Sequence, residues 1–329
     1  MAYTTIDDPS LYFQVQLYTG TGSSQAITLS GATDMALDIL WLHNRDAAEG
    51  IDMYDRVRGV TSRMRTSTNS AQDDQSANSL SAFGSDGFTV LTNTAVNADG
   101  NKYVAYCWDE SATSGVDIVA YDGTGSAHTE AHSLSAVPHV MIVKNREAVE
   151  GWAVYHHKNT AAPETDVLEM NATAATVDND PRWNDTAPTS SVFTVGDHAT
   201  TNQSDYAMIA YLFTEKQGFS KFGSYEGNGA ADGTFVYTGF RPAFVMCKSI
   251  DSTSDWLIFD DQREGYNVDN DALKANSNIA ETTTDMIDIL SNGFKCRIAT
   301  DPNVAETYVY MAFAKAPFVS SGGVPCNAR

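Results

Sequence analysis

Carboxylates are the most numerous ionisable side chains in this 329-residue chain, which has 42 Asp and Glu residues. Adjacent carboxylates occur, for example at Asp7-Asp8 and Asp260-Asp261. Cleavage of a glycosidic bond needs two carboxyl groups roughly 5–9.5 Å apart across the sugar. Among so many acidic residues some pair meets that spacing by chance, so the pattern identifies neither an acid nor a nucleophile. We therefore predict no enzymatic activity and no catalytic residue, and a polysaccharide depolymerase is the least favoured alternative.

Histidine and cysteine are the other residues that could hold a metal. Six of the seven histidines lie in the middle third of the chain: His128, His132, His139, His156, His157 and His198. A histidine cluster can bind a metal or act as a pH switch. No carboxylate or Cys completes a ligand set at a known spacing. His156-His157 in the middle third of the chain align with Asp260-Asp261 in the last third. This exchange of residue types indicates a position at the protein surface. We expect reduced structural thiols at Cys107, Cys247, Cys296 and Cys326, no cofactor and no metal site.

Calcium is the one cation that the acidic loops could suit, because it prefers hard oxygen ligands. The acidic residues concerned are Asp86, Asp260, Asp261, Asp269 and Asp271. Asp269-Asn-Asp271 offers two alternate carboxylates, but no complete ligand spacing follows. Calcium therefore stays an alternative without a ligand pattern, and solvated acidic loops are the expectation.

Aromatic residues could stack on sugars. Those that repeat in register along the chain are expected in a shared core: Tyr103, Tyr206 and Tyr308, and Phe88, Phe193 and Phe294. Trp183 breaks that register and lies in the polar loop Asp180-Pro-Arg-Trp-Asn-Asp185. A loop tryptophan beside Asn184 and Asp185 fits stacking on a glycan, and the alternative is a core anchor. We take Trp183, Asn184 and Asp185 as the candidate glycan contacts.

The element that positions these residues is a motif that occurs three times. Its tyrosines are about 100 residues apart, in Tyr18-Thr-Gly-Thr-Gly, Tyr121-Asp-Gly-Thr-Gly and Tyr225-Glu-Gly-Asn-Gly. Each copy ends on a similar apolar run, Val104–Trp108, Ile209–Phe213 and Met311–Lys315. The period is a domain length rather than the roughly 20–50 residues of a solenoid unit. The sequence therefore predicts three tandem modules, at residues 1–112, 113–216 and 217–329.

The sequence predicts that the modules are all-β. Short runs rich in Val, Ile, Tyr, Phe, Trp and Thr alternate with Asp-Gly and Asn-Gly turns, which is typical of a sandwich or barrel. We predict jelly-roll or lectin-like β-sandwiches, packed tightly because no Pro-rich or long Gly/Ser linker separates them. The polar stretches 61–79 and 160–190 are expected to be surface loops, where binding function is usually found.

Charge limits the partners. The formal net charge is −22 and the pI is about 4.4, so the field opposes nucleic acid and anionic membranes. No apolar run approaches the ~18 residues of a membrane span. The first residues lack the basic and apolar regions of a secretory signal peptide. We expect synthesis in a cytosol and no nucleic acid or membrane partner.

Several segments together resemble a repeat found in virion proteins of marine tailed phages, cyanophages among them. The segments are 1–14, Ser85-Asp-Gly-Phe-Thr-Val90, Tyr103–Trp108, 221–229, Phe235-Val-Tyr-Thr-Gly-Phe-Arg-Pro242, 290–295 and Ala312–Phe318. The resemblance covers nearly the whole chain. The second unit departs from it most, with Val192-Phe193 where the others have Gly87-Phe88 and Gly293-Phe294.

The resemblance implies a lectin-type β-sandwich in a virion structural protein, most often in the tail or its fibres, and supplies no catalytic residue. It implies a location in the virion and other virion proteins as partners. A homo-oligomer, favoured as a trimer, and host surface polysaccharide are further expected partners. The alternative is a capsid decoration or head-fibre protein that binds no ligand.

Overall fold

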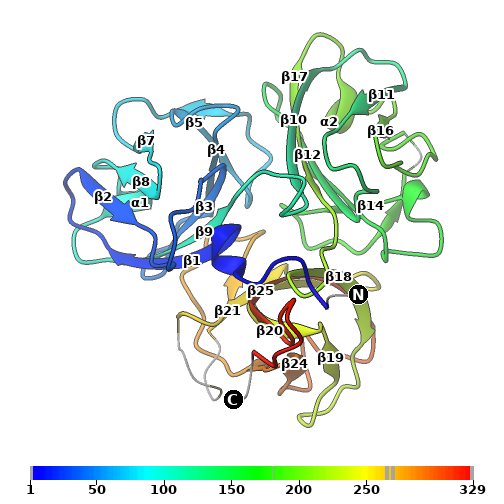
Figure 1. Cartoon of the computed structure of the whole chain (residues 1–329). Coiled ribbons are helices and arrows are strands. Elements are labelled where there is room, and N and C mark those ends of the chain that lie inside the picture. The colour runs from blue at the N-terminus through cyan, green and yellow to red at the C-terminus, as the bar shows by residue number, and fades with distance from the viewer. Residues whose placement is uncertain (1–2, 180, 264–266, 268–270, 327–329) are drawn as a thin grey trace.

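The computed structural model describes residues 3–179, 181–263, 267 and 271–326. Antiparallel strands dominate this part of the chain (Figure 1). The helices in it are single turns: the 3-10 helices η1 (Pro9–Leu11) and η2 (Pro163–Thr165), and the α-helices α1 (Thr94–Asn97) and α2 (Ala199–Asn202). The all-β prediction is confirmed.

The first large sheet runs from residue 13 to residue 108. Its strands lie in the order β1 (Phe13–Thr19), β9 (Lys102–Trp108), β3 (Ile39–Asn44), β4 (Asp52–Asp55), β5 (Ser62–Arg65) and β6 (Asp73–Asp74). A small sheet of β2 (Gln25–Thr28), β8 (Gly87–Val90) and β7 (Leu80–Phe83) accompanies it.

The second large sheet has the same strand order. It comprises β10 (Val116–Asp122), β17 (Ala207–Phe213), β12 (Val140–Asn145), β13 (Trp152–His156), β14 (Asp166–Glu169) and β15 (Val177–Asp178). Its small sheet pairs β11 (His128–Ala131) with β16 (Val192–Val195).

The third large sheet repeats the order once more. It comprises β18 (Ser220–Glu226), β25 (Thr307–Pro317), β20 (Phe240–Ser249), β21 (Leu257–Asp260) and β22 (Leu273–Lys274). Its small sheet comprises β19 (Phe235–Tyr237), β24 (Gly293–Cys296) and β23 (Ile287–Leu290). The boundaries expected at 112/113 and 216/217 fall between the last strand of one large sheet and the first strand of the next.

Both faces of each large sheet are buried. Along a strand, alternate side chains point to opposite faces. In β9, Val104, Tyr106 and Trp108 enter a core shared by all three large sheets, the central core, whereas Ala105 and Cys107 enter a separate core beneath the first small sheet. The second and third sheets also have an outer core each. This explains why these strands are continuous apolar runs.

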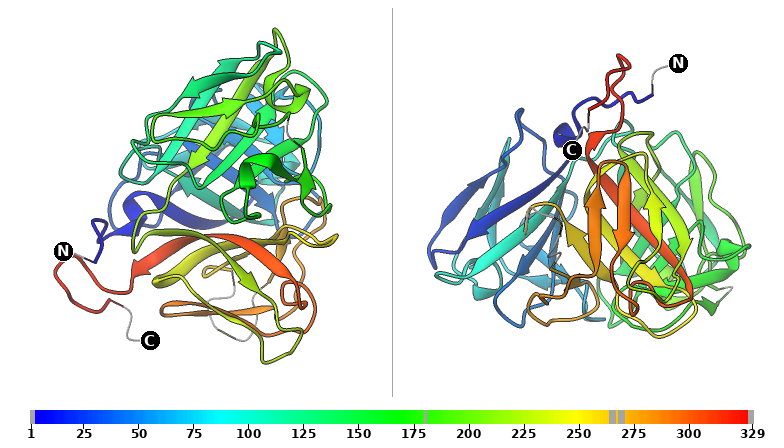
Figure 2. Two further views of the ribbon diagram at one scale, coloured as in Figure 1. Left: turned by 90° about the vertical axis from the view of Figure 1, so that its right-hand side faces the viewer. Right: turned by 90° about the horizontal axis from the view of Figure 1, so that it is seen from below.

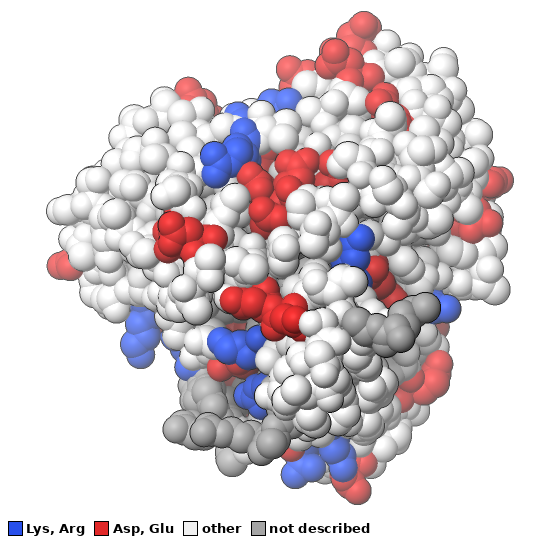
Figure 3. Space-filling view, viewed as in Figure 1, with Lys and Arg blue, Asp and Glu red and all other residues white. Residues whose placement is uncertain are grey.

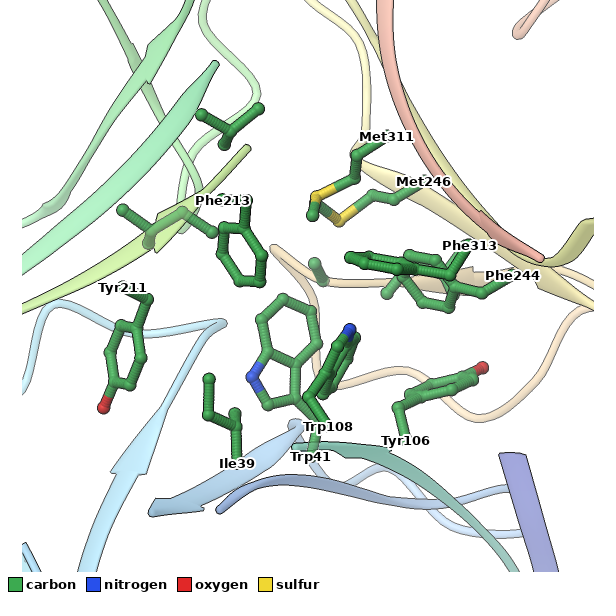
Figure 4. Packing of buried hydrophobic residues seen from close by; sticks show 14 of the residues in the cluster. Ile39, Trp41, Tyr106, Trp108, Tyr211, Phe213, Phe244, Met246, Met311 and Phe313 are labelled. Carbon is green, nitrogen blue, oxygen red and sulfur yellow. The ribbon is translucent and has the colours of Figure 1, made fainter. Parts of the chain in front are cut away.

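The central core is where the three sheets meet. Figure 4 shows side chains from all three sheets pointing toward one another. The ring of Phe313 lies 5.0 Å from that of Phe13, 5.8 Å from that of Trp108 and 6.2 Å from that of Phe213. Phe13 and Trp108 belong to the first sheet, Phe213 to the second and Phe313 to the third, so one aromatic cluster joins all three.

The repeated Tyr-x-Gly-x-Gly motif ends the first strand of each large sheet. The tyrosine hydroxyl donates to a backbone carbonyl in the segment before the last strand: Val96 O at 2.6 Å, Thr201 O at 2.6 Å and Pro302 O at 2.8 Å. A Cβ on the first glycine would overlap a backbone carbonyl oxygen in all three copies. The second glycine has a φ of 63–68° in all three, which glycine adopts without strain. The motif is therefore architectural.

An asparagine holds each of these turns. The Oδ1 of Asn97, Asn202 and Asn303 accepts from the backbone N–H that follows the first glycine, at 2.8, 2.7 and 3.1 Å. The Nδ2 of each donates to two backbone carbonyls. These three residues were not singled out from the sequence, although each follows the tyrosine of its motif at a similar distance, 78–81 residues.

The register between copies differs in two places from the sequence expectation. Phe13, Val116 and Ser220 lie opposite Trp108, Phe213 and Phe313. The run equivalent to Val104–Trp108 is therefore 309–313, so the predicted alignment of Met311–Lys315 is wrong by two residues. For the same reason Met208, opposite Tyr121, corresponds to Tyr103 and Tyr308, and Tyr206 does not.

The three sheets are joined in a closed cycle by equivalent backbone hydrogen bonds. Gln72 N donates to Arg146 O at 2.7 Å, from the first sheet's segment to the second's. Thr176 N donates to Ile250 O at 2.9 Å, and Glu281 N closes the cycle by donating to Arg45 O at 3.0 Å. Figure 2 shows the sheets around one centre, with both described ends of the chain on the same side.

Candidate functional site

Two of the three predicted glycan contacts line an open surface depression. Its volume is about 450 Å³, and its lining comprises Gly125, Ser126, Ala127, Pro181, Asn184, Asp185 and Asp197. It lies between the turn of the second tyrosine motif and the loop that carries Trp183. Both Asn184 and Asp185 are exposed and adopt positive φ angles of 52° and 45°. Asn and Asp tolerate this region better than most residues, which favours them at this turn.

The prediction that Trp183 stacks on a glycan is wrong. Its side chain is 0% exposed and belongs to the outer core of the second sheet, with its ring 6.0 Å from that of Tyr155. The indole Nε1 donates to Asp166 O at 3.0 Å, so the polar end of the ring is satisfied inside the protein. The alternative of a core anchor is the correct one. Trp183 supports the depression from below and leaves no ring face for a ligand.

Arg182 fixes the chain just before the depression. Its guanidinium donates to Glu169 Oε1 and to Thr200 Oγ1, both at 2.9 Å, and it lies against the ring of His198. Burial lowers the pKa of Arg182, and the carboxylates of Glu169 and Glu150 oppose that effect. The buried side chains of Arg182 and Trp183 thus hold the turn that presents Asn184 and Asp185.

The depression offers acceptors without a charged donor in its lining. Asp185 and Asp197 contribute carboxylates, Asn184 an amide and Ser126 a hydroxyl. Such groups can accept from, and donate to, the hydroxyl groups of a neutral sugar. The lining therefore suits hydroxyl-rich ligands and disfavours anionic ones.

Two of the three junctions between large sheets hold a buried Tyr–Asp–Arg group. Tyr211 of the second sheet donates to Asp55 of the first at 2.6 Å, and Arg58 pairs with the same carboxylate. Tyr106 of the first sheet donates to Asp260 of the third at 2.8 Å, and Arg263 Nε lies 2.6 Å from that carboxylate. The side chains of both ion pairs are at most 1% exposed.

The remaining junction, between the second and third sheets, has a different composition. Here Met311 stands at the tyrosine position and His156, the last residue of β13, at the aspartate position. His156 is 3% exposed, so the expectation of a surface substitution is wrong. Lys158 N donates to its Nδ1 at 3.1 Å, and its Nε2 lies 3.1 Å from Tyr310 O. This pattern requires a neutral imidazole that carries its proton on Nε2.

Two further histidines adjoin His156. The rings of His139 and His157 are 4.5 Å apart and perpendicular. His157 Nε2 donates to Phe222 O of the third sheet at 2.6 Å, and Glu215 N donates to His139 Nδ1 at 3.1 Å. Burial lowers the pKa of both histidines, and their mutual repulsion adds to the effect on His139.

We predict that acid weakens this junction. Burial, and next the neighbouring His157, lowers the pKa of His156 to about 3 from its usual 6.5. The unfolded chain therefore binds the proton first, so the stabilisation is complete above about pH 6.5 and is lost as the pH falls toward 3. We expect the free energy of unfolding to fall by about 3 kcal/mol from this group between pH 7 and pH 4.

Denaturant titrations of the wild type and of H156Q at several pH values measure this effect. The glutamine can still donate to Tyr310 O but does not titrate, so its acid loss should be smaller by the His156 contribution. The matched control is S135G, at an exposed residue that does not titrate, whose acid limb should follow that of the wild type. Equal acid losses for H156Q and the wild type would contradict the prediction.

The acidic residues considered for calcium are not brought together. Asp260 pairs with Arg263, Asp271 lies 3.9 Å from Arg45, and Asp86 accepts from Met35 N at 3.3 Å. Asp269 lies outside the described residues. No group of three or more His, Cys, Asp or Glu side chains in the described part of the chain is placed to hold a metal.

The cysteines provide no metal site or disulfide in the described part of the chain. All four cysteines are free thiols. Burial raises the pKa of the Cys247 thiol well above its usual value and that of Cys296 to about 12. Within the described residues, no helix combines the length and the apolar character needed to cross a membrane.

Comparison with known proteins gives a family. The family model described as "Domain of unknown function (DUF7483)" matches residues 8–317. Neither the curated proteins nor the solved structures contain a match to the chain. The matched region contains all three large sheets and every junction between them. The chain therefore belongs to the DUF7483 family.

Proposed function

We propose that the chain consists of three tandem β-sandwich modules related by an internal repeat, and that it is a structural protein of a tailed-phage virion. The common strand order, the three Tyr-x-Gly-x-Gly turns and the three asparagine clamps support the modular part. The likeness of several segments to virion repeats supports the viral part. A place on the tail or its fibres is the first choice, and a capsid decoration or head-fibre protein is the second.

The observation that carries the proposal is the closed cycle of three sheets around one central core. Each sheet buries one face in that core and the other in its own outer core, so the body is held from within. The turns and loops remain outside and can differ between sheets without disturbing the core. A body of this kind suits a particle component that must stay rigid while its surface loops specialise.

Imaging of the particle tests the proposal. Antibodies raised against the purified protein should label particles of the producing phage, and a symmetry-resolved reconstruction should contain the three-sheet body. Labelling on the tail supports the first choice, and labelling on the head supports the second. Particles that lack the protein, by labelling and by mass spectrometry, would overturn the assignment. Release of reducing sugar from host polysaccharide would favour a depolymerase.

The proposed partners follow from the same picture. Figure 3 shows acidic side chains gathered near the centre of one face, with basic side chains beside them. Because the surface field is negative overall, we expect contact with other virion proteins at local basic patches. We also propose that the chain forms a homo-oligomer, with a trimer as the favoured state. Light scattering of the purified protein gives the oligomeric state directly.

Glycan binding at the depression beside Asn184 is the recognition function we propose. The double variant N184G/D185G removes both side chains but keeps the positive φ angles, so the fold should be retained. On an array of bacterial surface polysaccharides we expect its binding to fall about tenfold, as for the loss of two polar contacts. S135G is the matched control, because Ser135 is exposed and has a φ of 53°. Unchanged binding by N184G/D185G would refute this site.

A further inference from the structure

At two junctions a glutamate satisfies an unpaired donor at the edge of a sheet. Glu110 follows the last strand of the first sheet and accepts from Ile118 N of the second at 3.1 Å. Glu215 follows the last strand of the second sheet and accepts from Phe222 N of the third at 2.9 Å. Both amides belong to edge strands, β10 and β18. An edge N–H otherwise lacks a partner within the sheet.

The junction between the third and first sheets lacks this glutamate. Val15 is the residue of the first sheet that corresponds to Ile118 and Phe222, because each lies two residues after the residue opposite Trp108, Phe213 or Phe313. The residue that corresponds to Glu110 and Glu215 is Lys315, two positions after Phe313. An ammonium group has no acceptor, so Lys315 cannot take the glutamate's part.

The ladder between β1 and β9 shows which way the Val15 amide points. Asp109 N donates to Tyr12 O at 3.0 Å, and Gly20 N donates to Asn101 O at 2.8 Å. Because hydrogen-bonded pairs alternate along an antiparallel ladder, the even-numbered residues of β1 bond to β9. The Val15 N–H therefore points away from β9, at the open edge of the sheet, and no described residue accepts a hydrogen bond from it.

A cleft of about 270 Å³ lies where the glutamate is missing. Val15, Asp261 and Lys315 line it, together with Ser10, Gln14 and Gly31. Ala243, whose carbonyl accepts from Asp261 N, is also in the lining; the equivalent residues in the other sheets are the larger Asp38 and His139. The missing glutamate and the small alanine together account for the opening.

The charges in the cleft are of both signs. The Asp261 side chain is 5% exposed, and its Oδ2 lies 3.8 Å from Lys315 Nζ. Its Oδ1 accepts from Gln262 Nε2 at 2.8 Å. The Gln14 Nε2 donates to Ser10 O at 2.9 Å, and its Oε1 accepts from Gly31 N at 2.8 Å. These two bonds hold the Gln14 side chain in place in the wall of the cleft. Asp8, also in the lining, accepts from Ser10 Oγ at 2.6 Å.

We propose that this cleft binds one acidic sugar unit of the uronic-acid class. Its carboxylate takes the place of the missing glutamate and accepts from Val15 N–H and Lys315 Nζ. Its hydroxyl groups donate to Asp261. The volume lies just below the range of ordinary ligand pockets, so one ring fits rather than an oligosaccharide. This site is separate from the depression beside Asn184, whose lining disfavours anions, and does not depend on a place in the virion.

Titration of the full-length protein with D-glucuronate tests the site. In a spectrum of ¹⁵N-valine-labelled protein, the Val15 cross-peak is assigned by its disappearance in V15I. We expect glucuronate to shift this peak at millimolar concentration, and methyl β-D-glucoside to leave it in place. No shift at the Val15 peak with glucuronate would overturn the proposal. Particle imaging has no bearing on this outcome, so the two proposals fail separately.

Variants separate the two ends of the ligand. K315M removes the ammonium group and should weaken glucuronate binding at least tenfold, whereas K102M, at an exposed lysine on β9, should leave it unchanged. D261N should reduce the preference for glucuronate over acetate. Equal affinity of the wild type for acetate and glucuronate would overturn the sugar assignment. Equal affinity of K315M and K102M would overturn the carboxylate assignment.

Discussion

The variant R58M should lose about 3–5 kcal/mol of the free energy of unfolding, the cost of leaving one buried charge without its partner. Arg58 and Asp55 have no exposed side-chain surface, and the guanidinium also donates to Ser62 O at 2.8 Å and Met53 O at 3.2 Å. Removing it leaves the Asp55 carboxylate with the Tyr211 hydroxyl, at 2.6 Å, and the Arg58 backbone N–H. Urea titration at pH 7 measures the loss.

The control for R58M lies two residues away. Arg56 pairs with Asp38 at 2.8 Å, but its side chain is 47% exposed. An exposed pair of this kind contributes at most about 1 kcal/mol, so R56M should have a small effect. The double variant D55N/R58M removes both charges and should recover part of the stability lost by R58M. A loss below about 1 kcal/mol in R58M would contradict the role assigned to the buried group.

The turns of the fold could be predicted from the sequence because their chemistry is local. The glycines of the tyrosine motif are required by a close backbone approach and by a positive φ, and both constraints act within a few residues of the turn. The strands were predictable for a similar reason, since β-branched and aromatic runs between Asp-Gly turns leave few alternatives. These signals need no knowledge of the rest of the chain.

The central core could not be predicted, because its residues lie in continuous apolar runs. In Val104–Trp108 every residue is apolar, so the alternation that would assign one face to the interior is absent. An apolar run of this kind fits several registers. The sequence therefore aligns Val104–Trp108 with Met311–Lys315, two residues away from the true equivalent at 309–313. Only the contact between sheets far apart in the sequence decides which face meets which core.

The sequence predicted only part of the candidate site, because it does not show which of the polar-loop side chains are buried. Asn184 and Asp185 were correctly expected at the surface, since polar residues in a turn remain hydrated. Trp183 has the same polar neighbours, yet the loop crosses the outer core and its indole finds a carbonyl there. His156 was misplaced because its burial depends on Tyr310, more than 150 residues away. The cleft beside Val15 exists because Lys315 stands where the other two sheets have a glutamate. This difference becomes visible only when the three sheets are compared in their true register.

The variant F313A should uncouple the three sheets. Phe313 contacts aromatic rings of all three, so its truncation should cost about 3–5 kcal/mol and remove the contact through which the sheets unfold together. We expect the single transition of the wild type in urea to separate into at least two, because each outer core can persist without the central one. F193A is the matched control: Phe193 is fully buried in the second outer core, so its loss should act on one sheet. If F313A and F193A give the same single transition with equal slopes, the central core does not couple the sheets, and the rigid body on which the proposed function depends would have to be held together in another way.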